Sequence, residues 1–470
     1  MATIGLTISD QINNQYRSYA IYVLQGRGIP NFYDGLTPVQ RLILENSPSR
    51  FDKTIGLVGE VIKTGLYHHG DTSLSGAISK LARPFGCSYP VLEGDGFFGS
   101  PVNPNPSAPR YTSVKINSKI KEFISKNYDL NEKNEEGGHT WIHVEIPIGL
   151  LIHVVGIAVG YRSNILPRKL EDVIEYLDGN PKLLKPYFRD FGGKISKFQN
   201  EENTWLIESG FNADSARKTI HIYDLPPVMR YDSFISKLDG RLENLGVEYR
   251  MENRSQSKCD LIISFRGVDS NRFKELSDSI SKMCKIIVKE DVIFVKDGGV
   301  LEFSSVKEYL DHFKGHLEYV KLRRLKKDEF DCLRDLSFLE AKVKFLNFMI
   351  LKKRTNIEIL NFLSEFESWI SQRLQRIEII KLSSDHIKET ESEIKAIKQR
   401  IQEVKRKVKE QEKKHRDITK EIEKTGKIKI TKSLNASLFE ETQVGGIEIF
   451  QIEEEDDEIQ TEIEEDEEEI

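Results

Sequence analysis

The residue with the clearest potential for covalent chemistry is Tyr111, which follows Arg110 in the stretch SAPRYTSVKI (residues 107–116). A tyrosine oxygen can accept a phosphoryl group from a phosphodiester and release it again, because the phosphotyrosine conserves the energy of the broken bond. The phenol has a pKa of about 10, so only about a thousandth of it is ionised at pH 7, and a neighbouring base or cation must assist it. The pair is therefore either a surface tyrosine beside an arginine or a nucleophile beside its cation.

The elements that must position this tyrosine are short helices and turns. Residues 1–130 are rich in Gly/Pro turns, and the segment 72–85 (TSLSGAISKLARPF) predicts a short helix opened by Thr72 or Ser73. Residues 111–124 place apolar side chains near helical spacing, with lysines on the other side. A turn-rich helical unit that carries basic residues suits a winged-helix DNA binder.

The middle of the chain changes character between residues 130 and 305. Apolar runs predict buried strands within residues 141–160, 218–227, 260–268 and 285–299, and a helix at 270–283 lies between two of them. This pattern indicates an α/β domain.

From about residue 306 the pattern is helical and charged. Apolar residues step by three and four from Cys332 to Ile350 and again from Ile394 to Val408, and the second register continues through Gln411 and His415. These heptads predict two long helices that fold back as an antiparallel coiled coil. The apolar stretch 354–382 between them predicts a small globule that pairs with a second copy of the chain.

Composition separates a basic body from an acidic tail. Residues 453–470 hold thirteen acids and no base, and removing those acids from the net charge of -6 leaves +7 for the remainder. The tail is either a solubilising disordered segment or a DNA mimic that competes for the basic body. Four scattered cysteines argue against a zinc site or a disulfide framework. We expect no signal peptide, no membrane span and a cytoplasmic protein associated with DNA.

Seven motifs follow one another along the chain: SYAIYVLQGRGIPNFYDGLTPVQRLIL, LYHHGDTSLSGAISKLARPF, LEGDGFFGS, PRYTSVKI, VGIAVGYRSNILP, IYDLPP and VKEYLDHFKGHLEYVKLRRL. Taken in this order, they resemble one family, the DNA breakage-reunion subunit of type IIA topoisomerases, which includes the A subunits of gyrase and topoisomerase IV and the medium subunit of T-even-type phages. The resemblance covers roughly residues 15–425, and the YHHGD spelling is most similar to the phage form.

The resemblance implies an α+β multidomain protein. Its parts would be an N-terminal arm and winged-helix domain with the catalytic tyrosine (1–125), a tower domain (126–305), a coiled coil with a helical dimerisation globule (306–440) and an acidic disordered tail (441–470).

The resemblance also implies roles for single residues. Tyr111 matches the nucleophile that becomes linked to a 5′-phosphate, and Arg110 matches the arginine that neutralises this phosphate. Arg27 matches a second phosphate-binding arginine, and His69 a nearby histidine. Ile157 matches the isoleucine that wedges between base pairs, although an isoleucine in an apolar run is more often a core residue. The remaining expected DNA-binding residues are basic: Arg41, Lys80, Arg83 and Lys115.

The implied activity needs partners. The sequence has no G-x-x-x-x-G-K-[ST] loop and no convincing acidic metal cluster, so the resemblance assigns ATP and Mg²⁺ to an ATPase/TOPRIM subunit. We expect a homodimer within that hetero-oligomer, acting on double-stranded DNA by relaxation or decatenation, because no room remains for a DNA-wrapping domain. If the chain is viral, it would act in the host cytoplasm. The alternatives are a non-catalytic DNA-organising coiled-coil protein and an inactive paralogue.

Overall fold

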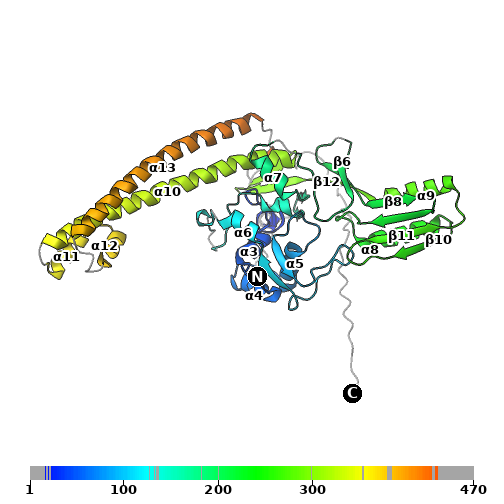
Figure 1. The fold of residues 1–470 in the computed structure, drawn as a ribbon, viewed down its shortest axis with the longest axis horizontal. Helices are drawn as coiled ribbons and strands as arrows, with labels where there is room; N and C mark the ends of the chain where they lie inside the picture. Colours follow the sequence, from blue (N-terminus) through cyan, green and yellow to red (C-terminus); the bar gives the residue numbers. More distant parts are fainter. Residues whose placement is uncertain are drawn as a thin grey trace, which may run out of the picture.

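Three parts make up the chain in its computed structural model (Figure 1). We call them the body, the outer unit and the arm. The outer unit and the arm project from opposite sides of the body. The structure describes residues 16, 19–20, 23–125, 127–131, 133, 137–180, 183–199, 201–297, 299–351, 354–377, 384–425 and 429–431.

The first half of the body consists of helices packed beside a small antiparallel sheet of strand order β1-β3-β2. The segment that we expected to be helical from residue 111 contains a strand, because Val114 and Ile116 point into the core while Ser113 and Lys115 alternate with them. The helix begins only at Ser118. The elements are α3 (Pro38–Asn46), β1 (Asp52–Lys53), α4 (Thr54–Lys63), α5 (Asp71–Ala82), β2 (Leu92–Asp95), β3 (Ser113–Ile116) and α6 (Ser118–Ser125).

The cap of α5 also differs from the expectation. Gly70 is the N-cap residue, so Thr72 and Ser73 lie inside the first turn. Asp71 occupies the first turn as well, where its carboxylate complements the positive end of the helix dipole.

The second half of the body completes the same hydrophobic core. This core runs from Phe32 to Phe313, so it crosses the boundary expected at residue 125 and includes Ile142, Val173 and Phe294. The elements are η2 (Leu24–Gly28), η3 (Tyr128–Leu130), η4 (Ile148–Leu151), β4 (Val154–Ala158), β5 (Tyr161–Ile165), α7 (Leu170–Leu177), β13 (Val292–Lys296), β14 (Gly299–Phe303) and β15 (Lys429–Thr431).

Most of residues 142–152 are buried as expected, but the strand lies only in the later part of the run, at Val154–Ala158, where Val155 and Ile157 are exposed. A tight 3-10 turn, η4, follows Pro147, and a Cβ on Gly149 would lie 1.9 Å from the carbonyl oxygen of Gly35. The close backbone approach and the proline, which cannot donate to a ladder, prevent a continuous strand here.

The outer unit confirms the strands and the helix expected between residues 218 and 289. Helices α8 and α9 bury their apolar faces against a sheet of order β10-β11-β9-β8, and a smaller sheet of order β12-β7-β6 joins this unit to the body. Its elements are β6 (Lys194–Lys197), β7 (Thr204–Glu208), β8 (Gly210–Asp214), β9 (Thr219–Tyr223), α8 (Tyr231–Asn244), β10 (Tyr249–Asn253), β11 (Asp260–Phe265), α9 (Ser270–Met283) and β12 (Lys285–Lys289).

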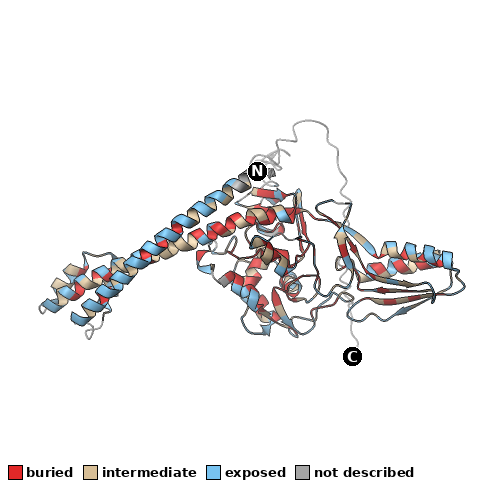
Figure 2. Cartoon of the chain, turned by 45° about the horizontal axis from the view of Figure 1, so that its top comes forward, coloured by how far each residue is buried: buried red, intermediate tan, exposed pale blue. Residues whose placement is uncertain are grey.

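The arm confirms the heptads. Helices α10 (Val306–Leu351) and α13 (Ser384–Thr425) run side by side, and the buried stripe along their seam is visible in Figure 2. At the tip, α11 (Asn356–Leu363) and α12 (Ser368–Gln375) form the small apolar globule. The acidic residues 441–470 lie outside the described residues. No described helix is both long and apolar enough to cross a membrane.

Candidate functional site

Tyr111 lies on an exposed turn that is fixed to the start of α4. The residue is 67% exposed. Its amide donates to the carbonyl of Ala108 (2.9 Å), and the next residue, Thr112, accepts from the amide of Thr54 (3.0 Å). The hydroxyl oxygens of Thr54 and Thr112 are also 2.8 Å apart and buried. The backbone of Tyr111 is thus held on both sides, while its phenol faces solvent.

Arg110 contacts the ring of Tyr111. Its guanidinium carbon lies 5.2 Å from the ring centroid, within the range of a cation–π interaction. The residue is exposed and makes no ion pair among the described residues. A fixed positive charge therefore accompanies the one strongly exposed tyrosine of this turn.

A groove of about 810 Å³ lies between α5, η2 and β4. Lys80 and Arg83 from α5 and its C-terminal end line it together with Ile157 from β4. Ile157 is 72% exposed, so the sequence alternative of a core isoleucine is wrong. Three of the expected DNA-binding residues thus share one groove.

The hairpin of β4 and β5 presses closely against η2, where Arg27 lies. A Cβ on Gly28 would lie 2.4 Å from the carbonyl oxygen of Ile157, and one on Gly156 would lie 2.1 Å from that of Gly28. Glycine at both positions permits this approach, which brings the backbone beside Arg27 to the base of the exposed isoleucine. The side chain of Arg27 lies outside the described residues.

Arg162 was missed by the sequence analysis. It lies opposite Ile157 in the β4–β5 ladder and is exposed. The only feature of the sequence that could have indicated Arg162 is its position just after the Gly160 turn. This position points to the groove only when the pairing of Ile157 with Arg162 in the hairpin is known.

The charge in the groove is partly desolvated. Burial lowers the pKa of Arg83, whose guanidinium carbon lies 5.0 Å from the ring centroid of Phe85. Burial likewise raises the pKa of the neighbouring Cys87 to about 11, which keeps this thiol neutral. A half-buried guanidinium without a carboxylate partner among the described residues is well suited to an anionic ligand.

Other expected residues lie away from this groove. His69 is exposed on the loop before α5, with its ring edge-on to Tyr67 at 5.6 Å. Lys115 forms an ion pair with Glu93 (2.9 Å). Among the described residues, no hydrogen bond, ion pair or ring contact joins Tyr111 to His69, Lys80 or Arg83. Within one copy of the chain, no described contact therefore links the tyrosine turn to the groove.

The prediction that Arg41 binds DNA was wrong, because its guanidinium is buried and is not available to a ligand. The residue is 3% exposed, and its Nε donates to the carboxylate of Asp34 at 2.7 Å. Asp34 also accepts from the amides of Leu36 and Ile142. This buried pair fixes the loop before α3, which is a structural role.

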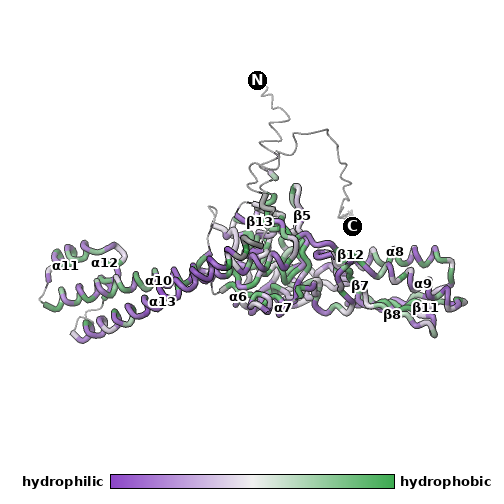
Figure 3. The backbone as a smooth tube through the Cα atoms, turned by 90° about the horizontal axis from the view of Figure 1, so that it is seen from above, coloured by the Kyte–Doolittle hydropathy of each residue, from purple (hydrophilic) through white to green (hydrophobic). Residues whose placement is uncertain are grey.

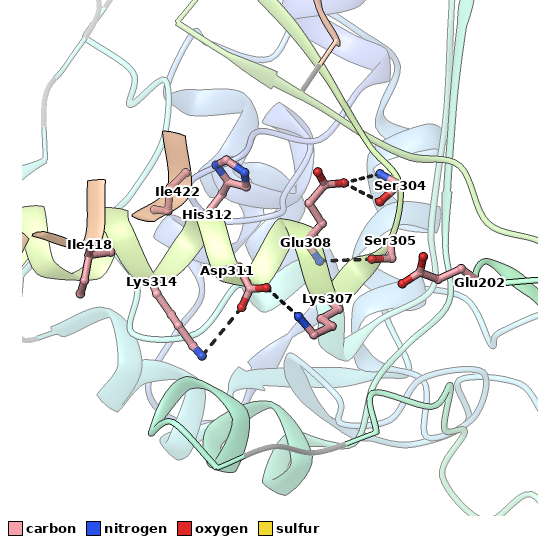
Figure 4. A pocket seen from close by; sticks show the side chains of 10 residues that line it. All are labelled: Glu202, Ser304, Ser305, Lys307, Glu308, Asp311, His312, Lys314, Ile418 and Ile422. Atoms are coloured by element: carbon pink, nitrogen blue, oxygen red, sulfur yellow. Dashed lines mark hydrogen bonds and ion pairs between the residues drawn. The ribbon is translucent and has the colours of Figure 1, made fainter. Parts of the chain in front are cut away.

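No described group of three or more His, Cys, Asp or Glu side chains could hold a metal ion. A second cavity, of about 640 Å³, lies where the start of α10 meets the end of α13 (Figure 4). Asp311 pairs with Lys307 and Lys314, and Glu308 accepts from Ser304. Both lysines of this cavity are therefore paired with the same carboxylate, and neither is free for an anionic ligand.

Comparison with known proteins gives the family. The family model for the A subunit of DNA gyrase/topoisomerase IV matches residues 27–423, and this chain therefore belongs to that family. It is 26% identical over 443 residues to the DNA gyrase A subunit of Buchnera aphidicola subsp. Baizongia pistaciae, a match that covers 83% of this chain and 49% of that one. It is 25% identical over 420 residues to the DNA topoisomerase medium subunit of enterobacteria phage T4, a match that covers 80% of this chain and 90% of that one.

The fold also matches a solved structure, that of the Plasmodium falciparum topoisomerase II DNA-binding, cleavage and re-ligation domain. The TM-score is 0.67 at 20% identity, over 89% of this chain and 65% of that chain. The mixed α/β fold with a long helical arm is thereby confirmed. The chain spans about half the length of the gyrase relatives that it matches. Family membership does not favour the alternative of a non-catalytic organising protein.

Proposed function

We propose that this chain is the DNA breakage-reunion subunit of an ATP-dependent type IIA topoisomerase, with Tyr111 as the nucleophile. The observation that carries the proposal is the exposed phenol of Tyr111 on a rigid turn, with the guanidinium of Arg110 against its ring. The groove that presents Lys80, Arg83 and Ile157 supports it, because cations that contact phosphates and an apolar wedge that enters a base step are what bending a duplex requires.

The proposed reaction is a transesterification. The phenol of Tyr111 loses its proton as its oxygen forms a bond to a backbone phosphorus, the bond from that phosphorus to the 3′-oxygen breaks, and the 3′-oxygen takes up a proton. The chain is then linked to the 5′-phosphate, and the reverse attack restores the DNA. Arg110 stabilises the charge that builds up on the phosphoryl oxygens in the transition state. We include Arg27 and His69 as further catalytic residues on the strength of the resemblance.

The proposed enzyme needs groups that the described residues do not supply. A divalent metal such as Mg²⁺ would stabilise the leaving 3′-oxygen. Because no described cluster of donors fits a metal ion, we assign Mg²⁺ and ATP to a partner with ATPase and TOPRIM parts.

The proposed architecture follows from the three parts of the fold. Helices α3–α5 with β1–β3 would be the winged-helix domain, and the outer unit would be the tower. Two copies would cut opposite strands and would also meet at the globule of α11 and α12, which exposes Ile357 (71%) and Leu360 (61%). We propose relaxation or decatenation as the outcome, in a DNA-associated hetero-oligomer.

A covalent-trapping assay tests the proposal. The chain is mixed with the ATPase/TOPRIM subunit encoded by the same genome, Mg²⁺ and supercoiled plasmid, and is then denatured with SDS. Wild-type chain is expected to become linked to 5′ ends of linear DNA, and Tyr111→Phe is expected to abolish the linkage.

The matched control is Tyr128→Phe, which removes the hydroxyl of a tyrosine that is 44% exposed on η3. It should trap DNA as the wild type does. If Tyr111→Phe still traps DNA, Tyr111 is not the nucleophile. If the wild type binds both DNA and partner without any covalent product, the enzyme proposal fails.

A further inference from the structure

The chain beyond the arm returns to the body on the side of the β4–β5 hairpin. Strand β15 begins four residues after the end of α13 and pairs with the edge of β14, with Thr431 opposite Val300 and Lys429 opposite Glu302. Strands β13 and β14 share a hydrophobic cluster in which Val300 and Val295 are buried, and Ala158 and Tyr161 of the β4–β5 hairpin pack against it. Figure 3 shows β13 and β5 together on this side of the body. The last described residue is therefore anchored beside the hairpin that carries Ile157.

The sequence that follows this anchor is long enough to reach the groove and strongly acidic. Residues 432–452 lead to the thirteen acids of 453–470. At about 3.3–3.6 Å per residue, such a connection spans at most roughly 70 Å, more than the radius of a body of this size. A segment tethered at this length has an effective concentration on the order of millimolar near its anchor.

The groove presents cations that nothing in the described chain neutralises. Lys80 and Arg162 are exposed and Arg83 is half-buried. None of the three makes an ion pair among the described residues. They surround Ile157, since Lys80 and Arg83 line its groove and Arg162 lies opposite it in the ladder. A run of carboxylates and a DNA backbone satisfy such a site by the same charge-assisted hydrogen bonds.

We propose that the acidic segment 453–470 docks in this groove in the absence of DNA and competes with DNA for Lys80, Arg83 and Arg162. The inference rests on the proposed function, because it takes the groove as the DNA site. The segment would act as an internal competitor for the groove. A duplex that binds the groove tightly would displace the segment, and a duplex that binds it weakly would not. Its effect must weaken as salt screens both interactions.

Binding of a fluorescent 20-base-pair duplex to the full chain, measured by anisotropy at low salt, provides the first test. A chain ending at residue 452 is expected to bind about tenfold more tightly than the full chain, and the difference should shrink at higher salt. A full-length chain with the thirteen acids changed to Gln and Asn should bind like the truncated one. An unchanged affinity in both variants overturns the inference.

A synthetic peptide of residues 453–470, added to the truncated chain, locates the site. The peptide is expected to compete with the duplex and to lose binding to Lys80→Glu/Arg83→Glu. The matched control Lys274→Glu/Lys282→Glu makes the same charge change on the exposed face of α9 and should retain the peptide. If both double variants lose peptide binding equally, the peptide responds only to net charge, and the proposal that the segment docks in the groove is wrong. Failure of the truncated chain to bind any duplex would instead contradict the proposed function.

Discussion

A buried ion pair between Arg168 and Glu290 joins the body to the outer unit. Arg168 and Glu290 form a salt bridge of 2.6 Å, with side chains 2% and 1% exposed. Glu290 also accepts from the indole of Trp205 (2.7 Å) and from the amide of Leu166 (2.8 Å), and Arg168 donates to two backbone carbonyls. The pair thereby joins the body to β7 of the outer unit. Its charges are buried but fully hydrogen-bonded, so removal of one partner leaves the other unpaired.

We predict that Glu290→Gln destabilises the fold by about 3–5 kcal/mol, because the guanidinium of Arg168 would remain buried without its carboxylate. Urea unfolding followed by tryptophan fluorescence measures this, since Trp205 lies in the network. The control is Glu248→Gln, whose ion pair with Arg266 is 69% and 71% exposed and should contribute less than about 1 kcal/mol. Equal effects of the two changes would contradict the prediction.

At the scale of elements, a polar contact fixes the register of α10 against α13. Glu318, at 6% exposure, accepts from the side chain of Gln411 (2.6 Å), and Lys321 and Lys414 pair with the same carboxylate. Burial alone would raise the pKa of Glu318, but the hydrogen bonds from Lys321 and Gln411 and the nearby charges lower it. Gln411 is one of two polar residues, with His415, that interrupt the apolar heptads, and its bond to Glu318 favours one alignment of the two helices.

We expect Gln411→Leu to weaken the local pairing of α10 and α13 by about 1–3 kcal/mol, because the buried carboxylate of Glu318 loses a donor. Hydrogen exchange of the amides on both sides of the contact reports local opening. The double variant Glu318→Leu/Gln411→Leu should recover part of the loss. Glu340→Gln, which removes the exposed contact with Lys398 between the same helices, should leave exchange unchanged. If exchange became faster only in Glu340→Gln, the contact of Gln411 with Glu318 would not be the one that stabilises the pairing of α10 and α13.

At the scale of the whole molecule, a cluster of rings around the buried His316 joins the arm to the body. His316 of α10 stacks on His143 at 5.7 Å and contacts Trp141 and Tyr33. Phe313 and Tyr319 flank it on its own helix, and Lys296 of β13 contributes positive charge. Burial, with the charges of His143 and Lys296, lowers the pKa of His316 to about 3.

This cluster should make stability depend on pH. The unfolded chain protonates His316 near pH 6.5, whereas the folded chain keeps it neutral down to about 3, so stability is fully present above pH 6.5 and falls below it. One such group costs about 2 kcal/mol between pH 7 and pH 5. Urea midpoints by tryptophan fluorescence should therefore fall less in His316→Leu than in the wild type over this range. The control His68→Leu, at an exposed histidine, should show the same change of urea midpoint with pH as the wild type. If His316→Leu also shows this change, His316 is not the source of the pH dependence.

Periodic patterns in the sequence predicted the parts that depend on local repeats. The strand and helix patterns of residues 218–289 and the heptads of the arm were confirmed, because each pattern directly defines which face of its own element is buried. The prediction of a helix at residues 113–116 was wrong, since these four alternating polar and apolar residues fit either period and pairing with β1 and β2 decided for a strand.

For the candidate site, the sequence by itself determined the residue types: an arginine beside a tyrosine, bases on α5, and an isoleucine between glycines. Only the tertiary structure decided what each of them can reach. It buried Arg41 against Asp34, exposed Ile157, and brought Arg162 beside the groove. The physical reason is that burial and charge neutralisation depend on neighbours distant in the chain, such as Thr54 for the turn of Tyr111 and Gly28 for the hairpin of Ile157. No spacing along the sequence encodes those contacts.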